Sequence, residues 1–222
     1  MSFPTIWEDI YRNNTHLSIW PWSDMVSYVM RYARPTGPAF RVLEIGVGAG
    51  ANVPFFRSLN TDYYAVDGSA TIIAKLQERF SDIAGNFRVA DFSKDLVVEG
   101  MFDLIVDRGA MTSNTETSIR ACLKLVHQKL KPGGKFISID MYSSQHSDYA
   151  LGTMLEDIYT KTDLEEGQLR GVGPIHFSDE AHMKSLFQDF EIEIMEHKIV
   201  QRLIPENSHR FASFNTICRK RG

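Results

Sequence analysis

The stretch RVLEIGVGAGANVPFF, Arg41 to Phe56, decides the fold of this 222-residue chain. It opens with a short apolar run rich in β-branched side chains, which is typical of a buried parallel strand. Alternating glycines follow, Gly46, Gly48 and Gly50, and then residues that can begin a helix. Such a turn directs free helix N–H groups at whatever lies above it, and glycines allow a ligand close to the backbone. The stretch therefore predicts a site for a nucleotide-like ligand.

The glycine pattern has two interpretations. Gly46, Gly48 and Ala51 fit the dinucleotide fingerprint G-x-G-x-x-G/A. Glu44 together with the three glycines gives E-x-G-x-G-x-G, which resembles motif I of the class I S-adenosylmethionine-dependent methyltransferases. A glycine pattern alone does not separate the two, so the rest of the chain has to.

Composition excludes several classes of protein. Charged residues make up 23% and hydrophobic residues 43%, which is ordinary for a soluble globular chain. A net charge of −4 argues against a general nucleic-acid binder, which needs a basic face to neutralise phosphates. With two cysteines, no signal-peptide pattern and no long apolar run, we expect a cytoplasmic protein without a membrane partner.

Strands and helices alternate after the glycine turn. Further strands are predicted at Thr61–Val66, Asn86–Ala90, Phe102–Val106 and Lys135–Asp140, and helices at about Asn52–Leu59, Ser69–Phe80, Glu116–Leu130 and Asp179–Phe190. The segments Glu191–Val200 and Arg210–Arg219 alternate in polarity and predict an antiparallel hairpin. The pattern indicates an α/β fold with a doubly wound, seven-stranded and mostly parallel sheet.

Two segments stand outside this alternation, although we expect residues 1–222 to form a single domain. Residues 1–38 carry an aromatic group, Trp7, Tyr11, Trp20 and Trp22, which could act as a helical lid over the ligand or as a strap that docks the first helix. Residues 141–177 form a long polar connection, predicted to be an inserted cap with a short helix from Leu151 to Ile158.

The order of elements resembles the class I methyltransferase fold, a Rossmann-like fold whose last strand inserts beside the fifth. NAD-binding Rossmann domains usually close with a parallel sixth strand instead. The turn Lys131-Pro132-Gly133-Gly134 before the fifth strand is also typical of the methyltransferases, and the resemblance covers about Arg41 to Arg219. It implies an enzyme that binds S-adenosyl-L-methionine.

The resemblance implies a small-molecule acceptor, methylated on a hydroxyl. The segments Trp20–Asp24 and Gly173–Phe177 resemble bacterial methyltransferases of surface-sugar and specialised pathways, which suggests a sugar or specialised metabolite. A nicotinamide-dependent oxidoreductase and a non-catalytic S-adenosylmethionine-binding scaffold remain the alternatives. The oligomeric state, monomer or homodimer, stays open.

The fold's geometry places ligands at the carboxyl ends of the strands. Asp67, followed by Gly68, ends the second strand roughly twenty residues past the glycine turn, where a carboxylate can accept both ribose hydroxyls. By resemblance, Asp91 and Phe92 meet the adenine, and Glu44 lies near the methionine portion. The predicted cofactor-binding residues are Glu44, Gly46, Gly48, Gly50, Asp67, Gly68, Asp91, Phe92, Asp107 and Tyr11.

The reaction needs a positioned acceptor and, for a hydroxyl or amine, a nearby base. Asp107 ends the fourth strand, beside the transferred methyl group by resemblance. His176 is the favoured base, because it lies where the long connection returns to the sheet. The other candidate bases are His146, His16 and Asp140. No residue spacing typical of a metal site is seen, so no metal is predicted.

Overall fold

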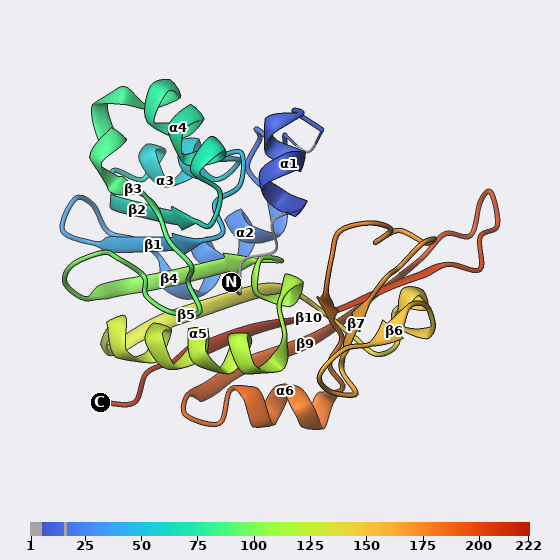
Figure 1. Cartoon of the computed structure of the whole chain (residues 1–222). Coiled ribbons are helices and arrows are strands. Elements are labelled where there is room, and N and C mark those ends of the chain that lie inside the picture. The colour runs from blue at the N-terminus through green and yellow to red at the C-terminus, as the bar shows by residue number, and fades with distance from the viewer. Residues whose placement is uncertain (1–5, 16) are drawn as a thin grey trace.

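The structure, a computed structural model, describes residues 6–15 and 17–222, so the candidate base His16 lies outside the described residues. Its central feature is a seven-stranded sheet in the order β3-β2-β1-β4-β5-β10-β9 (Figure 1). The strands are β1 (Arg41–Ile45), β2 (Asp62–Asp67), β3 (Phe87–Val89), β4 (Phe102–Arg108), β5 (Leu130–Tyr142), β9 (Glu191–Gln201) and β10 (Arg210–Arg219).

Strands β1 to β5 pair in parallel, whereas β10 pairs antiparallel with both β5 and β9. The predicted fold class and the C-terminal hairpin are therefore confirmed. The chain order reverses between β1 and β4, and in an open α/β sheet ligands bind at the carboxyl ends of the strands beside such a point. An antiparallel β10 next to β5 also excludes the parallel closure expected of a nicotinamide-binding domain.

Helices cover both faces of the sheet. They are α1 (Ile6–Arg12), α2 (Ser23–Tyr28) with the π-turn η1 (Val29–Ala33), α3 (Val53–Ser58), α4 (Ala70–Arg79), α5 (Glu116–Lys129) and α6 (Glu180–Leu186), with the 3₁₀ turns η2 (Ser81–Asn86), η3 (Met111–Ser113) and η4 (Ser147–Ala150). Among the described residues, no helix combines the length and the apolar character needed to cross a bilayer.

The strands alternate their apolar side chains between two cores, as a sheet buried on both faces requires. Leu43 and Ile105 face the core that α5 and α6 complete. Val42 and Leu104 face the other core, which α2, α3 and α4 cover. Helices therefore cover both faces of the sheet, and its carboxyl edge remains available for a binding site.

The predicted helix between Leu151 and Ile158 is wrong. The segment instead follows η4 into a small antiparallel sheet of β6 (Thr153–Met154), β7 (Thr160–Thr162) and β8 (Ile175–His176). Met154 and Ile158 are 62% and 61% exposed. Because the apolar face of that helix would have nothing to pack against, its periodicity does not decide the local structure.

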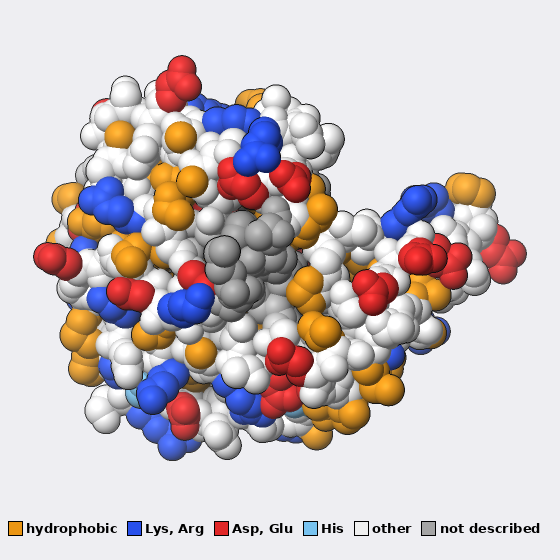
Figure 2. Space-filling model, in the orientation of Figure 1, with side chains coloured by type: hydrophobic (Ala, Val, Ile, Leu, Met, Phe, Trp, Pro, Cys, Tyr) orange, Lys and Arg blue, Asp and Glu red, His pale blue; other side chains and the backbone are white. Residues whose placement is uncertain are grey.

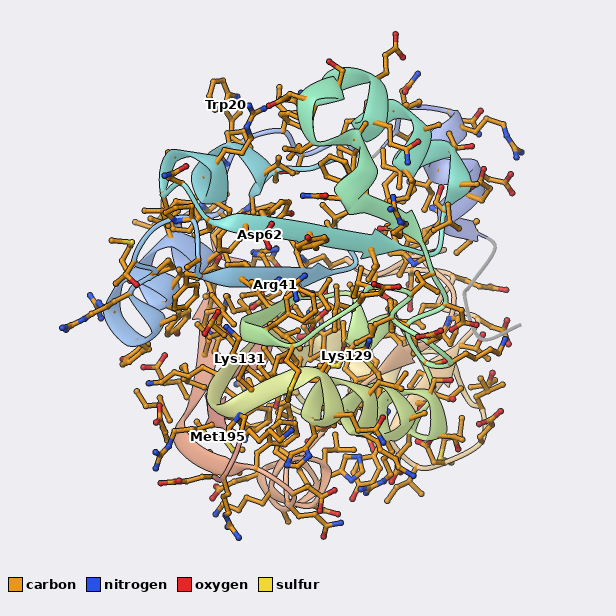
Figure 3. The ribbon with its side chains drawn as sticks, turned by 90° about the vertical axis from the view of Figure 1, so that its left-hand side faces the viewer. Trp20, Arg41, Asp62, Lys129, Lys131 and Met195 are labelled. Atoms are coloured by element: carbon orange, nitrogen blue, oxygen red, sulfur yellow. The ribbon has the colours of Figure 1, made fainter. Side chains whose placement is uncertain are left out.

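The Lys131–Gly134 turn follows α5, which ends at Lys129, one residue before its predicted end at Leu130. It lies inside β5 as a bulge, since Leu130 pairs with Phe102 and Lys135 pairs with Leu104. Nearby, the amino-terminal edge of the sheet is tied by ion pairs (Figure 3): Arg41 Nε lies 3.0 Å from Asp62 Oδ2, and Lys131 Nζ lies 2.7 Å from Asp103 Oδ2.

Glu44 places a carboxylate near the carboxyl end of β1, only 2% exposed. Asn52 Nδ2 donates to it at 2.8 Å from the start of α3, and the Tyr63 hydroxyl donates at 2.5 Å from β2. Burial raises the pKa of Glu44 to about 7, although these two hydrogen bonds oppose the shift. The carboxylate therefore joins β1, β2 and the turn between β1 and α3.

We predict that this carboxylate makes the stability of the protein depend on pH. Its pKa is raised above the unfolded value, so the folded state binds the proton more tightly, and stability falls as pH rises from about 4.5 to about 7. Glu44→Gln should remove this contribution, about 2–3 kcal/mol between pH 5 and pH 8. Urea unfolding at both pH values measures this contribution, and Glu206→Gln, at an exposed position, is the control. The prediction would be contradicted if the unfolding free energies of the wild type and Glu44→Gln changed with pH in parallel.

A second prediction concerns the glycine that follows β1. Gly46 has φ +66°, and a Cβ there would lie 2.1 Å from Ala110 Cβ; Gly109 has a similar φ of +69° but open space around it. Gly109→Ala should lower the free energy of unfolding by about 1–2 kcal/mol, because alanine disfavours the left-handed backbone. Gly46→Ala should lower it by about 1–3 kcal/mol more, because the added methyl group overpacks the contact with Ala110. Equal unfolding free energies for the two variants would show that close approach does not constrain Gly46.

Candidate functional site

A cleft of 300 Å³ opens at the carboxyl ends of β1, β2, β4 and β5. Its walls come from the N-terminal helices, the glycine turn, the segment after β4 and the region after β5. The lining residues are Trp7, Tyr11, Ser18, Trp22, Glu44, Gly46, Val47, Gly48, Ala49, Ala51, Asn52, Asp67, Phe92, Arg108, Gly109, Ala110, Ser113, Asn114, Asp140, Tyr142, Gln168, Leu169, Val172 and Ile175. The topology thus brings together segments from most of the chain.

The three glycines of the turn do different things. Gly46 allows the segment after β4 to approach, because a side chain there would meet Ala110. Gly50 allows α4 to approach, because a Cβ would lie 2.5 Å from Leu76 Cδ2. Gly48 lies on the cleft wall with the Tyr11 hydroxyl over it. Gly46 and Gly48 line the cleft, whereas Gly50 shapes the turn from behind.

Asp67 stands at the end of β2 and lines the cleft, 4% exposed. Its Oδ2 accepts the Gly48 N–H at 2.9 Å, and its Oδ1 accepts the Ser69 N–H at 2.9 Å. Burial raises the pKa of Asp67 to about 6, with the backbone N–H groups of Ser69, Gly48 and Gly68 opposing the shift. With three N–H groups on its two oxygens, the carboxylate keeps about one lone pair with which to accept a ligand hydroxyl.

Tyr11 and Trp7 close one side of the cleft from α1. Burial and the nearby Asp67 raise the pKa of the Tyr11 phenol well above its usual value, so it remains a neutral donor. Glu8 fastens this helix to the start of α4, accepting hydrogen bonds from the hydroxyls of Ser69 and Thr71. The predicted aromatic group does not stay together in the fold. Trp7, Tyr11 and Trp22 line the cleft, whereas Trp20 is 77% exposed.

Phe92 lines the cleft and is 8% exposed. Its predicted companion Asp91 lies outside the set of lining residues; its Oδ1 accepts the Ser93 hydroxyl at 2.7 Å, and Lys94 Nζ lies 2.9 Å from its Oδ2. Gly68 contributes a backbone N–H to Asp67 rather than a wall of the cleft. Of the residues predicted for the adenine, only the ring of Phe92 reaches the cleft in this structure.

Asp107 is fully buried at the end of β4. Its Oδ1 accepts the N–H groups of Ala110 and Met111, both at 3.1 Å. Burial raises its pKa to about 7 against those hydrogen bonds. The carboxylate therefore shapes the turn that carries Gly109 and Ala110 into the cleft, and does not itself line it.

At the opposite end of the cleft, Arg108 contacts one aromatic ring and two carboxylates. Its guanidinium carbon lies 3.7 Å from the centre of the Trp22 ring, a cation–π contact. Its Nε lies 3.2 Å from Asp24 Oδ1, and its Nη2 lies 3.0 Å from Asp140 Oδ2. Arg108 therefore joins α2 to the end of β5 across the cleft mouth.

Asp140 lines the cleft beside Arg108, with a side chain 9% exposed. Its Oδ1 accepts the Ser213 hydroxyl at 2.8 Å and lies 2.5 Å from Lys198 Nζ. Its backbone adopts φ +60°, which is uncommon for a residue other than glycine. Such conformations are concentrated at functional sites, so this candidate base has both the position and the backbone of a site residue.

His176 lies elsewhere, fully buried in β8. Its Nδ1 lies 3.0 Å from the Thr160 hydroxyl and its Nε2 lies 3.1 Å from His182 Nε2. Burial, with the neighbouring His182, lowers its pKa to about 3. Its ring thus packs with other cap residues, and neither it nor the candidate base His146, 2% exposed, belongs to the lining set.

Several lining residues have no counterpart in the sequence predictions: Asn52, Asn114, Tyr142 and Gln168. Tyr142 could have been found, because it lies two residues after Asp140, just beyond the end of a predicted strand. Gln168 lies in the long connection, where no periodicity indicates which residue turns inward. Asn114 follows η3 and is fixed by its own hydrogen bond to the Ala110 carbonyl at 3.0 Å.

Comparisons with known proteins agree with this geometry. The family described as "Methyltransferase domain" matches residues 42–134. A search of curated protein sequences finds no significant match.

Solved structures resemble the whole chain at low sequence identity. A SAM-dependent methyltransferase from Methanosarcina mazei is 18% identical, with a TM-score of 0.67, covering 91% of this chain and 99% of the other. The N-methyltransferase NodS of Bradyrhizobium japonicum, solved with S-adenosyl-L-homocysteine, is 14% identical, with a TM-score of 0.64 and coverages of 98% and 99%.

A third solved structure is the 1,6-didemethyltoxoflavin-N1-methyltransferase of Burkholderia thailandensis. It is 18% identical, with a TM-score of 0.64 and coverages of 96% and 85%. At such identities these structures establish the fold, and the family match at 42–134 adds the methyltransferase assignment. Residues 42–134 therefore carry a methyltransferase domain, and the chain as a whole has the fold of the class I S-adenosylmethionine-dependent methyltransferases.

Proposed function

We propose that this methyltransferase transfers the methyl group to a hydroxyl of a small polar molecule held at the Arg108–Asp140 end of the cleft. The observation that carries the proposal is the division of one cleft into two chemically different ends. The Gly48–Asp67 end offers backbone and carboxylate groups suited to a nucleoside. The Arg108–Asp140 end offers charged groups, already paired, which suit a polar acceptor.

The residues present fit the cofactor. Gly48 leaves the cleft wall without a side chain, and Asp67 lines the cleft with a carboxylate that can still accept a hydrogen bond. Phe92 supplies an apolar ring on the same wall. When bound, S-adenosylmethionine supplies a methyl group on a sulfonium that is ready to leave, so the protein's part is to position the acceptor and exclude water.

Asp140 is the residue we assign to the acceptor. Its carboxylate lines the cleft and is held in place by Ser213, Lys198 and Arg108, so its oxygens cannot turn away. A carboxylate so placed accepts the hydrogen bond of the acceptor hydroxyl and receives its proton as the new O–CH₃ bond forms. Trp22 and Tyr142 line the same cleft.

The size of the cleft supports a small acceptor. A volume of 300 Å³ lies at the lower end of the range for small-molecule sites. The Burkholderia thailandensis structure, by its description, contains both a small heteroaromatic acceptor and S-adenosylhomocysteine. A sugar hydroxyl or a specialised metabolite is within this class.

An amine acceptor is the second candidate. Two of the solved structures that share the fold are described as N-methyltransferases. A carboxylate can accept a hydrogen bond from an amine as it does from a hydroxyl, so the Asp140 geometry serves either atom.

An acceptor panel tests the proposal. The protein is incubated with S-adenosylmethionine carrying a labelled methyl group, and with small polar compounds supplied as matched hydroxyl and amine analogues. We expect labelled product from a hydroxyl compound. Labelling of the amine analogues alone would transfer the assignment to N-methylation, whereas cofactor binding without turnover across the panel would favour a scaffold protein.

We predict that Asp67 controls cofactor affinity and its pH dependence. Asp67→Asn should weaken binding of S-adenosylmethionine about 10–100-fold at pH 8, because a carboxylate acceptor is lost. In the wild type, whose Asp67 pKa is raised to about 6, affinity should fall as pH drops below 6 and the carboxylate gains a proton. Calorimetry at pH 8 and pH 5 measures both effects, with the exposed Asp82→Asn as the control. A pH dependence retained in Asp67→Asn would remove the ribose assignment.

We predict that Asp140→Asn lowers kcat by about 10²–10⁴-fold with the Kd for cofactor nearly unchanged. Asp24→Asn is the matched control, because Asp24 shares the Arg108 contact but does not line the cleft. If the two variants lose activity equally, Asp140 acts only through Arg108. His176→Gln tests the sequence-based alternative, and loss of turnover there with Asp140→Asn active would restore His176 as the base.

A further inference from the structure

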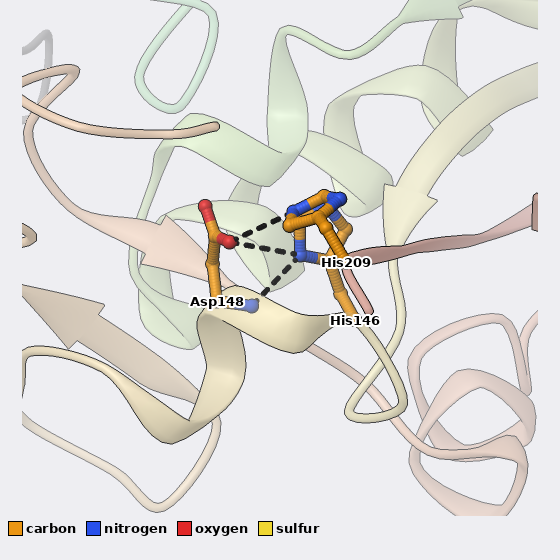
Figure 4. Close-up of side chains that lie close together, drawn as sticks. All are labelled: His146, Asp148 and His209. Atoms are coloured by element: carbon orange, nitrogen blue, oxygen red, sulfur yellow. Dashed lines mark hydrogen bonds and ion pairs between the residues drawn. The ribbon is translucent and has the colours of Figure 1, made fainter. Parts of the chain in front are cut away.

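A cluster outside the cleft brings together two histidines and an aspartate, His146, Asp148 and His209 (Figure 4). His146 is the N-cap of η4 and Asp148 lies within that turn, whereas His209 directly precedes β10. Residues 199–210, here called the arm, project beyond the sheet, as Figures 1 and 2 show. The cluster therefore lies where the base of the arm meets the start of the cap.

The potential ligand atoms converge. His209 Nε2 lies 3.0 Å from Asp148 Oδ1, and His146 Nδ1 lies 3.8 Å from the same oxygen. One ligand atom from each of the three residues lies within 4.8 Å of the others. Donor atoms bound to one zinc ion at about 2.0–2.2 Å are themselves roughly 3–3.5 Å apart, so a small closure suffices.

The histidine of η4 presents a lone pair to this group. His146 Nδ1 accepts the Asp148 N–H at 3.1 Å, so this nitrogen carries no proton. His146 Nε2 is buried, and the Gln168 side chain interacts with the ring. Nδ1 is therefore the ring nitrogen that can bind a metal ion together with Asp148 and His209.

The aspartate is a buried carboxylate, 1% exposed. Its Oδ2 accepts the Leu169 N–H at 2.7 Å, and its Oδ1 meets His209. The loop closes tightly over it, since a Cβ at Gly167 would lie 2.6 Å from Oδ2. A buried carboxylate needs a positive partner, and a metal ion is one that two imidazoles can share with it.

The surroundings of the His146–Asp148–His209 cluster are apolar on one side and open to water on the other. The rings of Tyr142, Phe177 and Phe211 pack around His146 at 5.3, 5.9 and 5.5 Å between centres. The His209 side chain is 28% exposed, so water can reach the open side. Two imidazoles with one carboxylate are a ligand set for zinc-type ions rather than for magnesium or calcium, which prefer oxygen alone.

We propose that His146, Asp148 and His209 bind a divalent transition-metal ion of the zinc type, with water completing the coordination. Ligation through His146 Nδ1 replaces the hydrogen bond from the Asp148 N–H. The ion fastens the base of the arm to η4 and, through Asp148 and Leu169, to the loop beside the cleft. It is a structural site, because none of its three ligands lines the cleft.

The test uses tag-free, chelator-treated protein titrated with Zn²⁺ in a calorimeter, with melting temperature as a second readout. We expect saturable binding of one ion per chain and a rise in melting temperature. His209→Gln should weaken binding by more than about 100-fold, since even the loss of an outer contact costs about 10–100-fold. His209 lies in an exposed connection, so this variant should fold, which circular dichroism checks.

Two control variants separate this site from others. His127→Gln, on α5, removes a histidine outside the cluster, and His182→Gln disrupts the other close histidine pair, His176–His182. Both should bind Zn²⁺ as the wild type does. A Co²⁺-loaded sample should show ligand-field bands without a thiolate charge-transfer band. No saturable binding, or binding unchanged in His209→Gln, would overturn the proposal, as would loss in His182→Gln alone.

Discussion

The hydrogen bond from the Gly48 N–H to Asp67 joins the turns that follow the two neighbouring strands β1 and β2. It fixes the glycine turn from the side of the second strand, and it holds the Asp67 carboxylate toward the cleft. The remaining parts of the site are arranged around this contact: α1 lies over it through Tyr11, and α4 starts beside it at Ser69.

The carboxyl edge of the sheet carries three buried carboxylates, Glu44, Asp67 and Asp107, on adjacent strands. Each is held by hydrogen-bond donors, and burial raises the pKa of all three. Burying such groups opposes folding, so their number at one edge indicates a functional arrangement. When ionised, they give that end of the cleft a negative potential, which suits a cofactor whose sulfonium is positively charged.

The other end of the cleft is built from segments distant in the chain. Arg108 at the end of β4 is placed between Asp24 of α2 and Asp140 of β5, while Lys198 reaches Asp140 from β9. The antiparallel hairpin that distinguishes this fold is thus also what brings Lys198 and Ser213 to the acceptor side. The same hairpin carries His209 to the base of the arm, so closing the sheet in this way shapes two separate places on the molecule.

Local patterns in the sequence determined the sheet, its order of elements and the positions at its carboxyl edge. Alternation and helical period depend only on near neighbours, and in a parallel sheet the end of each strand is a known place. Gly48, Asp67 and Phe92 could therefore be placed on the cleft from the sequence, as could Asp140 among the candidates. Tertiary structure decided which side chains of the long connection turn inward. His176 was expected beside the sheet at the site and is buried against His182, whereas Gln168, without any distinguishing pattern, lines the cleft. Such choices depend on packing between segments far apart in the chain, because the face that a loop residue buries is set by what covers it rather than by its neighbours in sequence.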